Sequence, residues 1–162
     1  STVSFTGLSS SYAAYVVMIN DLVPSGNAVD LYLRTSTDNG SSYDSSSSDY
    51  EWFTARLCAA TATQTHHISS VTGPTTSITC FDSSGSGTGE LVAGFVYILN
   101  PAGTLYTTIR SDLWGTQDDG YTAEGDGVGT RRSAADCDAI QFLMASGTIT
   151  SGTFRLYGIS PS

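Results

Sequence analysis

Few residues in this sequence have the types and spacing that acid–base or nucleophilic chemistry requires. The only histidines are the adjacent pair His66 and His67, and neighbouring residues on a strand point to opposite faces. The pair therefore does not chelate one metal ion from a regular strand, and no His-x-His or His-Glu-x-x-His spacing supplies a zinc site. No Gly-x-Ser-x-Gly elbow, phosphate-binding loop or dinucleotide fingerprint occurs. We expect no catalytic residues and no enzymatic activity.

Possible ligands gather between Asp112 and Gly127. Carboxylates alternate there with glycines and offer the hard oxygens that Ca²⁺ prefers, although the spacing is not that of an EF-hand. Trp114 and Tyr121 could also stack on a sugar ring while the carboxylates bind its hydroxyl groups. An ordinary long loop with a packed tryptophan explains the same residues and is the interpretation we favour, with no cofactor. The candidate Ca²⁺ ligands are Asp112, Asp118, Asp119 and Asp126.

One short segment, Ser36 to Tyr43, has the pattern of a tight turn. It resembles the Asp-box, a Ser-x-Asp-x-Gly-x-Thr-aromatic hairpin found in sialidase-type propellers, with serine in place of the threonine and Tyr43 in place of the usual tryptophan. In such a turn Asp38 accepts hydrogen bonds from backbone N–H groups and Gly40 supplies the positive φ. The motif is structural and predicts no hydrolysis.

Composition excludes several classes of protein. Fifteen acidic residues stand against six basic ones, all arginine, so the formal charge is −9. This charge argues against binding to the phosphate backbone of nucleic acid, and no apolar run reaches the roughly 18 residues of a membrane span. The start of the chain has no secretory signal, and we expect the chain to be nearly complete. Three cysteines, an odd number at no metal-ligand spacing, predict small buried thiols in place of disulfides.

Alternation of apolar and polar residues predicts about ten short strands in a single domain spanning residues 1–162. The run from Tyr15 to Ile19 is apolar at nearly every position, as in a strand covered on both faces. Further strands are expected over 31–35, 50–57, 65–71, 76–81, 91–99 and 104–109, and residues 114–129 are expected to form a Gly/Asp-rich excursion. No segment keeps a helical period over three turns. We therefore predict an all-β fold, an antiparallel β-sandwich that is jelly-roll-like.

The last part of the chain carries the clearest alternation. Ile140, Phe142 and Met144 are expected to point into the core, and Phe154 and Leu156 do so again after a turn at Ser146-Gly147. We expect these two segments to pair as an antiparallel hairpin.

Several segments together resemble small surface proteins of tailed-bacteriophage virions. They are Phe5–Leu8, Tyr12–Tyr15, Asp21–Pro24, Leu31–Gly40, Asp49–Tyr50 and the ending Ser146–Ile159. The resemblance covers the first 50 and last 25 residues well and the middle poorly, and it transfers no site residues. It implies a β-sandwich displayed on the particle as a capsid decoration or as a head- or tail-fibre component. The free cysteines agree with synthesis in the reducing host cytoplasm before assembly into the virion.

The expected function is therefore that of a virion structural protein that acts by protein–protein contacts. Its partners would be other virion proteins of the capsid or tail scaffold, together with copies of itself. Unpaired edge strands predict a homo-oligomer, and analogy with phage fibres suggests a trimer. The alternative is a carbohydrate-binding module that recognises a glycan on the host surface. A binding module of that kind would expose a coplanar aromatic platform beside acids, whereas a structural protein would bury Tyr50, Trp52 and Trp114.

Overall fold

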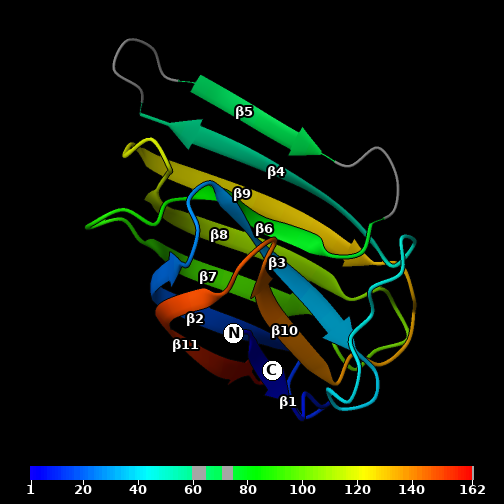
Figure 1. Ribbon diagram of the computed structural model, residues 1–162. Helices are drawn as coiled ribbons and strands as arrows, with labels where there is room; N and C mark the ends of the chain where they lie inside the picture. Colours follow the sequence, from blue (N-terminus) through cyan, green and yellow to red (C-terminus); the bar gives the residue numbers. More distant parts are fainter. Residues whose placement is uncertain (60–64, 71–74, 162) are drawn as a thin grey trace.

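In residues 1–59, 65–70 and 75–161, which the computed structural model describes, the chain forms two antiparallel sheets packed face to face (Figure 1). All regular secondary structure there is strand, so the predicted antiparallel β-sandwich is confirmed. No helix in these ranges is long and apolar enough to cross a membrane. The strands are β1 (Val3–Thr6), β2 (Ala14–Pro24), β3 (Val29–Ser36), β4 (Tyr50–Cys58), β5 (Thr65–Ser70), β6 (Ile78–Ser84), β7 (Val92–Leu99), β8 (Thr108–Thr116), β9 (Thr122–Arg131), β10 (Ala139–Met144) and β11 (Ile149–Ile159).

The pairing of the strands is nested. The four-stranded sheet has the order β1-β10-β3-β6, and the seven-stranded sheet has the order β11-β2-β7-β8-β9-β4-β5. Within this arrangement β2 pairs with β11, β3 with β10, and β4 with β9. Both β2–β3–β4 and β9–β10–β11 pass from the large sheet to the small one and back again. The two segments therefore run as one antiparallel ribbon around the sandwich, which is a jelly-roll-like winding.

The core lies between the two sheets. Ile140, Phe142 and Met144 on β10 are buried, as their alternation predicts. Phe154 and Leu156 on β11 are partly buried and pack against the same core. The rings of Phe142 and Phe154 lie with their centroids 5.3 Å apart, so this contact joins one sheet to the other.

The predicted terminal hairpin is wrong, because β10 and β11 belong to different sheets. The turn between them has Gly147 at φ 71°. The amide of Thr148 donates to the Ser25 hydroxyl, and the Ser25 amide donates to the Thr148 carbonyl, so this turn binds to the one between β2 and β3. Alternation tells which side chains point inward, but both sheets share one core, and the pattern does not identify the sheet.

The predicted excursion over 114–129 is also wrong, since these residues form most of the β8–β9 hairpin. The strand expected over 104–109 begins only at Thr108, and the preceding Leu105 and Tyr106 are exposed in a loop. The inward positions of β9 explain the error about the excursion. Three of them are occupied by Gly125, Gly127 and Gly129 in place of large apolar side chains, so the segment lacks the usual sign of a strand.

The glycines of β9 allow the small sheet to approach the large one. A Cβ atom on Gly129 would overlap the side chain of Ile78 on β6, and one on Gly125 would lie 3.2 Å from the ring of Phe81 on the same strand. None of these glycines needs a positive φ, so close packing, not backbone conformation, selects them. The side chains of β6 thus pack directly on the backbone of β9.

Gly129→Ala should destabilise the protein by about 1–3 kcal/mol, because it overpacks this contact. Ile78→Ala should also destabilise it, by leaving a cavity of the same shape. The double variant should lose at least about 1 kcal/mol less than the sum of the single losses, since the new methyl group fills part of that cavity. Urea unfolding of the four proteins measures this coupling. Gly125→Ala is the milder control, and strictly additive losses would show that the Gly129–Ile78 contact does not limit packing.

Candidate functional site

Asp38 organises the turn that follows β3. Its carboxylate accepts hydrogen bonds from the Ser42 amide at 2.8 Å, the Ser42 hydroxyl at 2.6 Å and the Ser36 hydroxyl at 2.7 Å. These hydrogen bonds lower the pKa of Asp38 to about 2, and the bond from the Ser42 hydroxyl has the largest effect. Gly40 has φ 82°, and the Tyr43 side chain packs against it. The turn predicted from the Asp-box pattern is therefore confirmed, and its polar groups bind one another.

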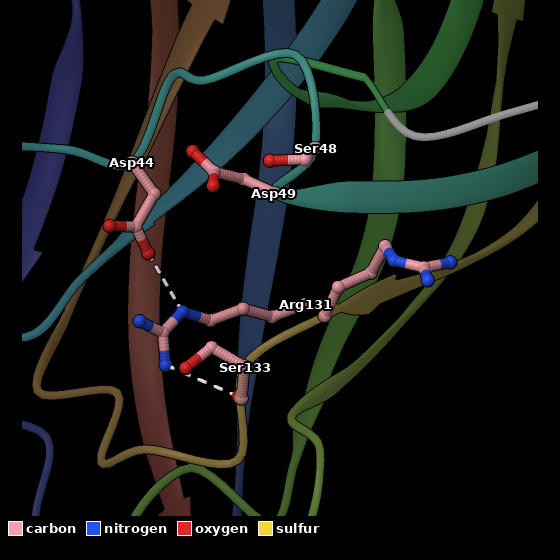
Figure 2. A pocket seen from close by; sticks show the side chains of 6 residues that line it. Asp44, Ser48, Asp49, Arg131 and Ser133 are labelled. Atoms are coloured by element: carbon pink, nitrogen blue, oxygen red, sulfur yellow. Dashed lines mark hydrogen bonds and ion pairs between the residues drawn. The ribbon is translucent and has the colours of Figure 1, made fainter.

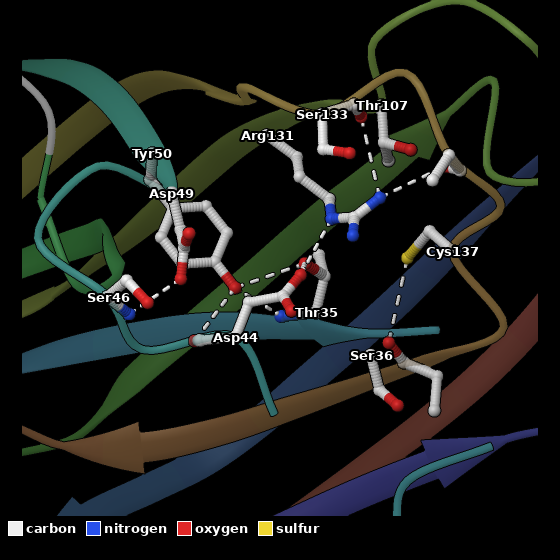
Figure 3. Close-up of polar contacts among 12 residues, drawn as sticks. Thr35, Ser36, Asp44, Ser46, Asp49, Tyr50, Thr107, Arg131, Ser133 and Cys137 are labelled. Carbon is white, nitrogen blue, oxygen red and sulfur yellow. Dashed lines mark hydrogen bonds and ion pairs between the residues drawn. The ribbon is translucent and has the colours of Figure 1, made fainter. Parts of the chain in front are cut away.

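Arg131, at the end of β9, joins the loops at this end of the sandwich (Figure 3). Its side chain is buried, and its Nε donates to Asp44 Oδ2 at 2.7 Å. Its Nη1 donates to the carbonyl of Ala135 at 3.0 Å, and its backbone amide donates to the Thr107 carbonyl. The Arg131 guanidinium thus connects the β3–β4 loop with the β9–β10 loop, and its backbone amide holds the loop before β8.

Tyr50 lies beside this ion pair with its side chain fully buried. Its hydroxyl accepts a hydrogen bond from the Thr35 amide at 2.8 Å and donates to the Asp44 carbonyl at 3.1 Å. Burial raises the pKa of the Tyr50 hydroxyl to about 12, so it stays neutral. The tyrosine fixes the backbone of Asp44, whose carboxylate binds Arg131.

A pocket of about 320 Å³ opens next to this network (Figure 2). It lies between the β3–β4 loop and the residues that follow β9. Figure 2 shows the Asp44–Arg131 pair on one side, with Ser48 and Asp49, from the same β3–β4 loop as Asp44, on the other. The lining residues are Asp44, Ser48, Asp49, Arg131, Arg132 and Ser133.

The charged groups of this pocket are bound to other groups of the chain. Asp49 accepts from the Ser46 amide at 2.6 Å, and Arg132 forms an ion pair with Glu51. Arg131 and Asp44 bind each other. No histidine, cysteine or lysine is among the lining residues to activate the two serine hydroxyls. The pocket is therefore a polar junction between loops.

The four candidate Ca²⁺ ligands do not converge. Asp112 on β8 and Asp126 on β9 are cross-strand neighbours that point away from the core. Asp118 and Asp119 lie in the tight turn at the end of the same hairpin, where Asp119 accepts from the Tyr121 amide. Six residues of a strand span about 20 Å, so the turn is far from Asp112. Within the described part of the chain, no three acidic, histidine or cysteine side chains group closely enough to hold a metal ion.

The two candidate aromatic ligands also lie apart. Trp114 points outward from β8 and is 43% exposed. Tyr121 is paired with Gln117 across the turn of this hairpin. The Gln117 side chain is buried, on the side of the hairpin that Trp114 points away from. Nearest to Trp114 is Phe95 on β7, with ring centroids 6.1 Å apart and planes inclined by 59°. The aromatic side chains therefore do not form a coplanar platform. Tyr50 and Trp52 are the other two aromatic residues whose burial distinguishes a structural protein from a glycan-binding module. Tyr50 is buried, and Trp52 is partly buried against the core.

The remaining candidates for chemistry are the two histidines and the three cysteines. His66 and His67 belong to β5, and their side chains lie outside the described part of the structure. Cys58, Cys80 and Cys137 are free and buried, which confirms the expected thiols. Burial raises the pKa of the Cys80 and Cys137 thiols to about 12, so neither forms a thiolate readily.

The outward side of the seven-stranded sheet is the most distinctive surface of the molecule, and we call it the open face. No described segment packs on it; in Figure 1 the four-stranded sheet covers the opposite side. Its apolar side chains are half-buried or exposed, with Phe53 48% and Ile68 72% exposed. The open face includes Ala14, Val16, Met18 (β2), Glu51, Phe53, Ala55, Leu57 (β4), Ile68 (β5), Ala93, Phe95, Tyr97, Leu99 (β7), Arg110, Asp112, Trp114 (β8), Glu124, Asp126, Val128 (β9), Arg155, Tyr157 and Ile159 (β11).

The open face also corrects one expectation. The apolar run from Tyr15 to Ile19 predicts a strand covered on both faces. Tyr15, Val17 and Ile19 are buried in the core, but Val16 and Met18 lie on the open face, which no described element of the chain covers. The sequence signal that could have revealed this surface was present as apolar residues at both alternating positions of β2, β4 and β7.

No family model matches the chain, and neither a curated protein nor a solved structure matches it. The candidate site is therefore chosen on geometry alone. The loop pocket has its charges bound within the chain, whereas the open face leaves large apolar side chains in solvent. Contiguous apolar surface of this kind marks an interaction site in most soluble proteins. The open face is the candidate functional site.

The carboxyl group of Asp38 should titrate with a midpoint near pH 2, well below its ordinary pKa of 3.8. A depressed folded-state pKa means that the turn's contribution to stability is fully present above about pH 4 and is lost as the pH falls towards 2. Carboxyl NMR chemical shifts measure the midpoint. Ser42→Ala removes the main cause and should raise the midpoint towards the ordinary value; an unchanged midpoint would contradict the assignment.

Arg131→Met should lower the free energy of unfolding by about 2–4 kcal/mol, because it removes one member of a buried ion pair and leaves carbonyl groups without donors. The neighbouring Arg132→Met is a matched control. Arg132 is largely exposed and pairs with Glu51 at the surface, so its loss should cost less than about 1 kcal/mol. Urea unfolding distinguishes the two variants, and equal losses would show that Arg131 does not hold the loops.

Proposed function

We propose that this chain is a structural protein of a tailed-bacteriophage virion, displayed on the particle as a capsid decoration or as a head- or tail-fibre component, and that it acts by protein–protein contacts. The open face is the observation that carries this proposal. It presents exposed aromatic and aliphatic side chains on a rigid sheet, as contact surfaces do. The likeness of the first 50 and last 25 residues to virion surface proteins supports the assignment to a particle.

The placement of the ionisable groups supports a role without catalysis. A hydrolase of glycosides requires two carboxylates on either side of a bound sugar in a shaped site. Asp112 and Asp126 instead stand side by side on the outward side of the sheet, where Asp112 is partly exposed and Asp126 is exposed. The pocket between the loops holds charges that already bind one another. The free, buried thiols agree with synthesis in the reducing cytoplasm of the host.

A module that binds a host-surface glycan is the second candidate, and Trp114 favours it. Its ring is exposed on the open face and lies across the strand pair from Glu124. An exposed indole beside a carboxylate can stack on a sugar and accept bonds from its hydroxyl groups. The inclined planes of Trp114 and Phe95 suit this role less well than a flat platform would.

Two matched variants test the contact surface. Phe53 on the open face and Tyr106 in the loop before β8 are exposed to a similar degree, 48% and 54%. Phe53→Asp should abolish incorporation of the chain into particles, because it places a charge in an apolar contact, whereas Tyr106→Asp should leave incorporation unchanged. The measurement is an immunoblot of virions purified on a density gradient from infected cells that supply each variant.

The same preparation separates the candidates. A wild-type chain that never sediments with particles would overturn the assignment to the virion. Binding of the isolated protein to a glycan array, lost in Trp114→Ala while particle incorporation persists, would establish the glycan-binding role. Equal incorporation of the Phe53 and Tyr106 variants would show that the open face is not the contact surface.

A further inference from the structure

The open face has the dimensions of a protein–protein interface. Seven strands lie side by side in this sheet, and its central strand, β8, has nine residues. With strands about 4.8 Å apart and about 3.4 Å per residue, the face measures roughly 29 Å by 27 Å, or about 800 Å². A stable interface of standard size buries about 800 Å² on each partner. A single partner that covers the whole face would therefore bury enough area for a stable complex.

The charges at the centre of this face are incompletely paired. Arg110 on β8 forms an ion pair with Asp126 on β9, at 3.3 Å. Asp112 lies directly across from Asp126, and like charges in that position repel each other. The Asp112 carboxylate has no hydrogen bond or ion pair with any residue of the described ranges. A cation supplied from outside the chain would therefore stabilise the centre of the face.

Arg110 of a second copy of the chain can supply that cation to Asp112. Arg110 and Asp112 are two residues apart on the same side of β8, which is the middle strand of the sheet. A twofold axis in the plane of the interface, perpendicular to β8 and passing between these residues, places Arg110 of one copy over Asp112 of the other. An axis parallel to the strands would instead place Arg110 over Arg110. Each arginine would then bind Asp126 of its own chain and Asp112 of the second copy.

The same rotation also matches the apolar side chains of β2 and β7. Tyr97 and Val16 are cross-strand neighbours in one row, and Phe95 and Met18 are neighbours in the next. These two rows continue the rows of Arg110 and Asp112 across the sheet. The axis that pairs Arg110 with Asp112 therefore places Tyr97 over Phe95 and Val16 over Met18. On β2 and β7 apolar residues therefore meet apolar residues, and on β8 opposite charges meet, whereas on β9 Val128 faces Asp126.

We propose that a second copy of this chain covers the open face, in a twofold dimer in which Arg110 of each copy binds Asp112 of the other. The proposal rests on the proposed function, since it names the partner of the same contact surface. It explains why Val16 and Met18 follow the pattern of a strand covered on both faces, because the second cover comes from the other copy. The dimer, and not the single chain, is then the unit displayed on the particle.

Charge exchange tests this geometry. In Arg110→Asp and in Asp112→Arg, like charges face each other across the twofold axis, and each variant alone should have a dimer dissociation constant at least about 100-fold higher than wild type. An equimolar mixture of the two variants should restore dimers, because each aspartate then faces an arginine of the other chain. Sedimentation equilibrium measures the association, and native mass spectrometry identifies the mixed dimer. Arg34→Asp, on the outer side of the small sheet, should dimerise like wild type.

A second pair of variants tests the same geometry if the first pair fails to fold. Val16→Asp and Met18→Arg place opposite charges at facing positions of β2, so each should weaken the homodimer and their mixture should recover it. Circular dichroism melting of each isolated variant confirms that the monomer is folded.

The outcomes separate the two proposals. Failure of both folded mixtures to recover dimers overturns the twofold arrangement, and so does a wild-type chain that is monomeric or trimeric. If such a chain nevertheless incorporates into particles through Phe53, the proposed function stands and another virion protein covers the face. Dimers that follow the charge-exchange rule but never occur on particles support the dimer and overturn the virion role.

Discussion

The close approach of β6 to β9 is the constraint on which the sandwich depends. Gly125 and Gly129 leave no side chain between the two backbones, so Ile78 and Phe81 pack directly on the strand. β9 also pairs with β8 on one side and β4 on the other. At its end, Arg131 reaches three loops. One strand therefore sets the spacing of the layers and the positions of the loops beyond them.

Much of the fold could be predicted because alternation reports directly on burial. Ile140, Phe142 and Met144 point inward as expected, and the Asp38 turn forms as its residue types indicate. The errors have physical causes. On β9 three of the inward residues are glycines, so close packing produced a pattern that resembles a loop. Between β10 and β11 the alternation was correct while the pairing was not, since a change of sheet leaves the inward pattern unaltered.

The candidate site was harder to predict than the fold. The residues with conspicuous chemistry, Asp118, Asp119 and Tyr121, lie in a turn whose groups bind one another. The open face is formed by residues such as Phe53, Ile68 and Tyr157, which are far apart in the sequence and come together only through strand order. An apolar residue on a strand is ordinarily assigned to the core, and only the sheet topology shows that one side of the large sheet lacks a covering layer.

The nested pairing of β2 with β11 and of β4 with β9 has a consequence for the order of folding. The β7–β8–β9 meander contains neighbouring strands joined by short connections, so it can form early at little cost in chain entropy. β2 joins this meander through β7, but its other edge stays unpaired until β11 has been synthesised. Contacts between such distant segments slow folding. During synthesis the nascent chain therefore carries a sheet in which one edge of β2 is unpaired, and β11, which follows every other described strand in the sequence, is the strand that pairs with it.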